Sequence, residues 1–173
     1  DRAMSTIYEE IGARRAGILK AWRPLLASGP QASCPSASCQ TGRFTEPVAY
    51  LAGECANDVL SWLMAGRPSE EAPASLDDWC RLRAVQEVSP SRALRPIFDL
   101  KRIARDAVGA KGDADGWAAF DERVDEIALL AFDRYAESRE KLFQVRRDEM
   151  RRGEGIMNSR QARDRARLKG DGR

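Results

Sequence analysis

The sequence contains no histidine among its 173 residues, and this absence argues against several kinds of site at once. Serine and cysteine nucleophiles usually need histidine as their general base, and zinc and haem iron are most often held by imidazole nitrogens. We therefore expect a protein that is not an enzyme, with no catalytic residues, no bound metal and no cofactor.

Long apolar runs are also missing. No stretch of about 18 consecutive apolar residues occurs, and the first residues lack the basic-then-apolar pattern of a secretory signal. We therefore expect a soluble, cytoplasmic protein with no membrane insertion. The apolar content of 43% lets a chain of this length bury one sizeable core, so a single domain is expected.

Cysteine is scarce, with four residues in the whole chain. Because no export signal is present, reduced thiols are expected in place of disulfides. Cys55 and Cys80 fall on apolar helix faces and are predicted to lie in the core. Cys34 and Cys39 lie in a serine-rich and proline-rich loop, where a metal site or a redox pair is the weaker alternative because their spacing is loose for zinc.

The residues that are present predict an all-α bundle of five helices with a long C-terminal helix. Apolar residues recur at steps of three and four, the period of an amphipathic helix. The five predicted segments are residues 5–25, 45–66, 77–88 and 90–108, and a helix of about 35 residues that begins near Trp117. Residues 27–42 and 109–116 carry turn-forming residues and are predicted to be loops.

The stretch 77–108 is the predicted centre of the bundle. A residue before proline avoids the α conformation, so one helix should end at Ser89, and the next should begin with Ser89 as its cap and Pro90 as its first residue. Pro96 is expected to bend the second helix because it cannot donate a backbone hydrogen bond. The face predicted to pack on other helices carries Leu94, Ile97, Phe98, Lys101, Ala104 and Val108.

Large polar side chains lie near this apolar face, which is costly unless each finds a partner. The candidates for binding a ligand or a partner are Arg81, Arg83, Gln86, Ser89, Arg92, Lys101, Asp133 and Arg139, with Asp125 and Arg134 in the same set. Arginines and a helix N-terminus favour a small anion or an effector. Charges of both signs equally suit an internal network of ion pairs and caps that fixes the angles between helices, and both interpretations stay open.

The last helix carries a seam at steps of three and four. Its residues are Phe120, Val124, Ile127, Ala131, Tyr135, Ser138, Leu142 and Val145. At about 1.5 Å per residue, such a helix exceeds the width of a domain of this size. We therefore expect its end to project or to pair with another chain, and we predict a homodimer.

From Arg146 onward the sequence becomes basic, with ten basic and five acidic residues. We expect a helical regulatory domain over residues 4–152 and a basic, disordered tail over 153–173. Binding of nucleic acid by this tail is the weaker alternative, because no aromatic residue follows Phe143 and acidic residues interrupt the basic run.

Several short motifs of the sequence point to one family. They are Arg43-Phe44-Thr45-Glu46-Pro47-Val48, Arg81-Leu82-Arg83-Ala84-Val85-Gln86 followed by Ser89-Pro90-Ser91-Arg92-Ala93, Leu100-Lys101, and Ala131-Phe132-Asp133-Arg134-Tyr135 with Ser138-Arg139-Glu140. In these motifs, the chain resembles the N-terminal domain of the RsbRD type of RsbT co-antagonist proteins, relatives of the stressosome sensor subunits of bacteria. The resemblance runs from about Ile7 to Arg152.

The resemblance implies an all-helical regulatory or sensory input module that dimerises and acts through protein partners of a regulatory pathway. Related sensor domains have a globin-like fold without haem. Full-length members of the family continue into a STAS domain, whereas this sequence continues into a basic tail. Stand-alone copies look like accessory proteins of anaerobic sulfur-respiring bacteria, so the alternative function is a small adaptor that binds nucleic acid or a respiratory membrane complex through its basic end.

Overall fold

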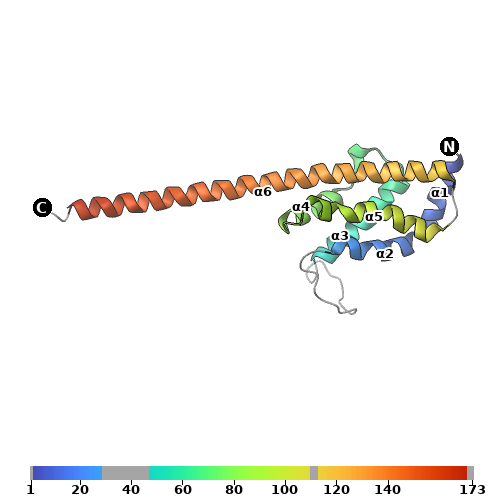
Figure 1. The fold of residues 1–173 in the computed structure, drawn as a ribbon, viewed down its shortest axis with the longest axis horizontal. Coiled ribbons are helices and arrows are strands. Elements are labelled where there is room, and N and C mark those ends of the chain that lie inside the picture. The colour runs from blue at the N-terminus through green and yellow to red at the C-terminus, as the bar shows by residue number, and fades with distance from the viewer. Residues whose placement is uncertain (1, 29–46, 110–112, 171–173) are drawn as a thin grey trace, which may run out of the picture. The chain divides into compact units, whose positions relative to one another are not determined.

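The computed structural model describes residues 2–28, 47–109 and 113–170, and the side chains of 7–28, 47–109 and 113–153. Within these residues the chain forms α-helices, one short 3-10 helix and no strand, which confirms the predicted all-α class. The elements are α1 (Arg2–Ala13), α2 (Arg15–Ala27), α3 (Pro47–Met64), the 3-10 helix η1 (Ser69–Glu71), α4 (Ala74–Val85), α5 (Pro90–Val108) and α6 (Ala114–Gly170), as Figure 1 shows.

The chain divides into two compact units at residue 138. The first unit, Asp1–Ser138, contains α1 to α5 and the first part of α6. The second unit, Arg139–Arg173, contains the remainder of α6. The candidate site described below lies entirely in the first unit.

The first helix predicted from the sequence is two helices, α1 and α2, so the prediction of one helix there was wrong. Arg14 separates them with φ −106° and ψ 10°, outside the helical range. Its backbone N–H donates to the Ile11 carbonyl at 3.1 Å, and its side chain forms an ion pair with Glu10. Ile11 and Ile18 are both buried across the break, which is why the apolar period continued through it.

The break predicted between the third and fourth segments, residues 77–88 and 90–108, is present. Ser89 has φ −62° and ψ 149°, and Pro90 is the first residue of α5. The Ser89 side chain makes no capping hydrogen bond, contrary to the prediction, and its hydroxyl lies 3.4 Å from the Ser91 hydroxyl. The corner also requires Glu87 to adopt a positive φ of 57°, which is uncommon outside glycine.

Buried indole groups connect the helices of the first unit. The Trp22 Nε1–H on α2 donates to the Pro96 carbonyl on α5 at 2.6 Å. The Trp79 Nε1–H on α4 donates to the Leu26 carbonyl at the end of α2 at 3.1 Å. A buried indole N–H must find an acceptor, so these two bonds set how α4 and α5 meet α2.

The packing face of α5 differs from the predicted one at Phe98. Four of the predicted members, Leu94, Ile97, Ala104 and Val108, are buried. Phe98 is 45% exposed, so its assignment to the core was wrong. Leu100 and Ile103 are buried as well, so the packing face extends to the side of the helix away from Phe98.

Helix α6 has 57 residues, many more than predicted. Its seam residues in the first unit, Phe120, Val124, Ile127, Ala131 and Tyr135, are buried as core. Val145 in the second unit is 54% exposed. The backbone is helical to Gly170, where the sequence predicted disorder from residue 153, because residues such as Arg, Gln and Ala favour a helix.

A matched pair of substitutions on α6 tests which face packs. Ile127 is fully buried and Leu129 is 67% exposed, two positions apart. Ile127→Ala should lower the free energy of unfolding by about 2–5 kcal/mol, because it leaves a cavity in the core. Leu129→Ala should change it by less than about 0.5 kcal/mol at low protein concentration. Urea denaturation followed by circular dichroism measures both, and equal losses would contradict the assigned face.

Candidate functional site

Arg83 is the one charged side chain recorded as buried among the described residues, with 1% of its surface exposed. It comes from the last turn of α4 and reaches the C-terminal end of α2. One terminal nitrogen, Nη2, donates to the carbonyls of Leu26 at 2.5 Å and Ser28 at 2.6 Å. The other, Nη1, donates to Oε1 of Gln86 at 3.0 Å.

The Arg83 guanidinium therefore caps a helix end. The last carbonyls of α2 have no partner within their own helix and carry partial negative charge, which suits a cation. The guanidinium also lies 5.4 Å from the centre of the Trp79 ring. Burial lowers the pKa of Arg83, because a charge held away from water is disfavoured.

The other predicted site residues are spread over several places. Ser89 and Arg92 line one cleft, and Arg81 lines a different groove. Lys101 pairs with Asp125 at 2.6 Å, and Arg134 pairs with Asp77 at 3.2 Å. Asp133 is exposed on α6, and Arg139 lies in the second unit with its guanidinium 4.9 Å from the Phe143 ring centre. Of the eight candidates, the structure thus joins Arg83 with Gln86, and Ser89 with Arg92.

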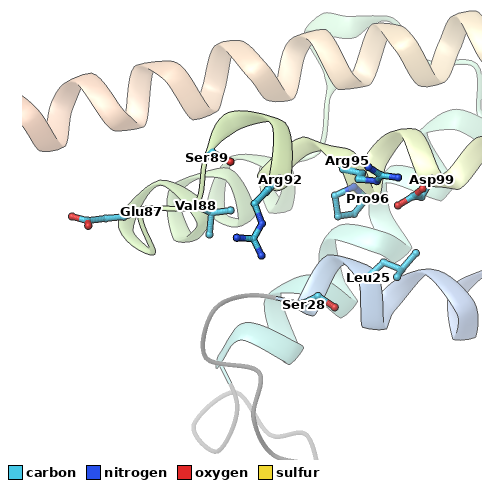
Figure 2. A pocket seen from close by; sticks show the side chains of 9 residues that line it. All are labelled: Leu25, Ser28, Glu87, Val88, Ser89, Arg92, Arg95, Pro96 and Asp99. Carbon is cyan, nitrogen blue, oxygen red and sulfur yellow. The ribbon is translucent and has the colours of Figure 1, made fainter.

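The cleft that contains Ser89 and Arg92 is the main candidate site, and we call it the corner cleft. It has a volume of about 610 Å³ and lies between the end of α2 and the corner of α4 and α5. Figure 2 shows its lining residues, which are Leu25, Ser28, Glu87, Val88, Ser89, Arg92, Arg95, Pro96 and Asp99. Arg83 donates hydrogen bonds to the Ser28 carbonyl on one wall of the cleft and to Gln86, the residue before Glu87 on the other wall.

The corner is also tied to α6. The Tyr135 hydroxyl donates to the carbonyl of Val88, one of the residues that line the corner cleft. Tyr135 itself is only 3% exposed. The backbone of the cleft wall is thus connected to α4 through Gln86 and to α6 through Val88.

The sequence analysis missed Arg95 and Asp99 as members of this site. They lie three and seven positions after Arg92 on α5, the spacing that places residues on one face of a helix. That spacing was visible in the sequence. The contribution of Leu25 and Ser28 was not, because it depends on how α2 packs against α5.

A second groove of about 480 Å³ lies between α3 and α4. Its lining residues are Pro47, Tyr50, Leu51, Asp78, Arg81, Leu82 and Val85. Arg81 is exposed and lies 3.5 Å from Asp78, so its charge is balanced in place. This groove is mainly apolar and contains no other basic side chain.

Neither a metal site nor a membrane span is found in the described part of the chain. No group of three or more His, Cys, Asp or Glu side chains is placed there to hold a metal ion. None of its helices combines the length and apolarity that crossing a membrane requires. Cys34 and Cys39, considered above as a metal or redox pair, lie outside the described residues.

The remaining two cysteines are buried and reduced, as the sequence predicted. Burial raises the pKa of the Cys80 thiol to about 12, with Asp77 adding to the effect and Arg134 opposing it. Burial likewise raises the pKa of Cys55, to which Cys80 and Asp58 add. Since the thiolate is the reactive form, a raised pKa makes both thiols unreactive in the folded protein.

Comparison with protein-family models matches residues 31–150 to the family described as RsbT co-antagonist protein rsbRD N-terminal domain. The match covers most of the chain and includes α3 to α5. No curated protein and no solved structure matches the chain.

Arg83→Glu should destabilise the fold by on the order of 3–5 kcal/mol, because a buried negative charge would face the carbonyls at the end of α2. The matched control is Arg81→Glu, two positions away and exposed, which should cost less than about 1 kcal/mol. Chemical denaturation of both variants measures the difference. A stable Arg83→Glu protein would contradict the capping role.

The two buried thiols give a second test. In the variant Cys34→Ser with Cys39→Ser, Ellman's reagent at pH 8 should label neither Cys55 nor Cys80 while the protein is folded. Both should react after addition of denaturant, when burial no longer raises their pKa values. Rapid labelling of the folded protein would show that one of them is accessible.

Proposed function

Because the chain belongs to the family of RsbT co-antagonist protein rsbRD N-terminal domains, we propose that it is a non-catalytic input module that acts by binding other protein chains. The family is a stressosome-related regulatory domain, which agrees with an input role. The absence of histidine from the whole sequence supports a role without catalysis.

One observation carries the proposal of protein binding: the first unit exposes large apolar side chains on neighbouring helices. Phe98 on α5 is 45% exposed, and Leu129 and Phe132 on α6 are 67% and 46% exposed. We call these three side chains the apolar patch. A group of exposed apolar side chains commonly marks a contact surface for another protein.

Ion pairs place these residues on one side of the molecule. Lys101 of α5 pairs with Asp125 of α6 at 2.6 Å, and Arg105 pairs with Asp121 at 2.5 Å. The later residue on α5 pairs with the earlier residue on α6, so the two helices run antiparallel. Phe98 lies one turn before Lys101, and Leu129 lies one turn after Asp125, so both fall beside these pairs.

The ion pairs also bear on which partner fits. Because Lys101 and Arg105 are already neutralised within the chain, the charges beside the apolar patch present little net field to an approaching surface. A surface with little net charge can contact an identical surface without repulsion, so a second copy of this chain is a suitable partner. We therefore propose a homodimer as the first assembly, with further protein partners from a regulatory pathway.

The second unit offers apolar side chains of its own. Phe143, Val145 and Met150 are each more than half exposed on α6. Full burial of one such side chain contributes about 1.5–3 kcal/mol. Phe143 and Met150 lie seven positions apart and therefore on one face of the helix, where they form a separate candidate contact that can be tested independently.

Replacement of the apolar patch tests the proposal. The intact chain should sediment as a dimer, with about twice its mass of 19.3 kDa, at tens of micromolar. Leu129→Glu with Phe132→Glu should shift it to monomer, because four carboxylates would then meet at a symmetric contact. Sedimentation equilibrium measures the mass, and circular dichroism checks that the helices remain.

Val85→Glu is the matched control, because Val85 is 54% exposed but lies on α4 beside the second groove. It should leave the dimer intact. A monomeric intact chain would argue against the homodimer. A dimer that survives the patch variant but dissociates with Phe143→Glu and Met150→Glu would move the contact to the second unit.

A further inference from the structure

We propose that the corner cleft binds a small organic anion, whose acidic group lies at the first turn of α5 and whose apolar body lies against α2. Its assignment as the input of the module rests on the proposed function, whereas binding itself does not. The volume of about 610 Å³ falls within the usual range for small-molecule sites.

Two arginines supply the positive charge. Arg92 and Arg95 both line the corner cleft, and neither has an ion-pair partner among the described residues. Figure 2 shows Arg92 extending from α5 toward the wall formed by Ser28. Arg81 and Arg105, in contrast, are each balanced by a carboxylate. Arginines that make no ion pair in a concave site favour a ligand that brings an anionic group, and Arg92 is the one of the two that lies away from Asp99.

The start of α5 adds backbone donors at the same end of the corner cleft. Pro90 has no N–H, and the Ser89 side chain does not cap the helix. The first intrahelical bond runs from the Ala93 N–H to the Ser89 carbonyl at 2.9 Å, so the N–H groups of Ser91 and Arg92 have no acceptor within the helix. Together with Arg92 they form an environment suited to one negative group.

The two carboxylates that line the corner cleft limit what else can bind. In Figure 2 the Glu87 side chain points away from the cleft, so it does not neutralise Arg92. Asp99 lies beside Arg95, away from Ser89. A second acidic group on the ligand would approach Asp99, so a ligand with one negative end is favoured.

The remaining wall is apolar. Leu25 from α2, and Val88 and Pro96 from the corner and α5, line the cleft between the charged groups. A bare inorganic ion would leave this surface in contact with water. An organic body would cover it, which is why the proposal names an organic anion.

Phenyl phosphate and benzoate are suitable probes, because each joins one anionic group to an apolar ring. At least one should bind the intact chain saturably in an isothermal or NMR titration, more tightly than inorganic phosphate, and more weakly as salt is added. Arg92→Gln should weaken that binding at least about tenfold, as expected for loss of a charge-assisted hydrogen bond. Arg102→Gln, an exposed arginine on the same helix paired with Asp106, should leave it unchanged.

Binding of neither probe in the low millimolar range would overturn the proposal, as would binding that Arg92→Gln leaves intact. If inorganic phosphate binds as tightly as both probes, the inference that the ligand has an organic body is wrong. The titration is separate from the test of the proposed function, because dimerisation is measured without any ligand. A chain that binds a probe but never dimerises would keep this site and lose the proposed homodimer.

Discussion

The fold of the first unit depends on one buried charge. The Arg83 guanidinium holds the carbonyl end of α2 from within the core, and its only other recorded hydrogen bond goes to the amide of Gln86. Removing a charge from water costs several kcal/mol unless its donors find acceptors, and the end of α2 and Gln86 supply acceptors for both terminal nitrogens of Arg83. Packing of apolar faces alone would allow α2 to slide or rotate, whereas two fixed acceptors at its last carbonyls do not.

Part of this arrangement was readable from the sequence, and the reasons are local. The corner before α5 follows from Pro90, which acts through its own ring on the preceding residue. The seam of α6 follows from a regular repeat of apolar residues. The division between α1 and α2 did not show, because Arg14 is neither glycine nor proline and the apolar period continues through it. Phe98 was misplaced because periodicity gives the direction of a face but not its width.

For the candidate site too, the sequence shows which residues share a face of one helix but not which helices pack together. Its members on α5 share one face and are related by sequence spacing, so Arg95 and Asp99 could have been grouped with Arg92. The opposing wall comes from α2, some sixty residues earlier in the chain, and only the packing of helices brings it there. Sequence reasoning treated the polar residues as one cluster, whereas the structure separates a buried cap from an open cleft. The interpretation as an internal network fits Arg83, and the ligand pocket is a proposal that concerns the residues of the corner cleft.

The corner between α4 and α5 has a mechanical consequence. Its backbone is held on one side by Arg83 through Gln86 and on the other by Tyr135 through the Val88 carbonyl, with Glu87 fixed at a positive φ between them. These contacts oppose bending of the chain at this corner. A rearrangement within the first unit is therefore expected to move α4, the corner and the start of α5 together with the end of α2, which Arg83 binds.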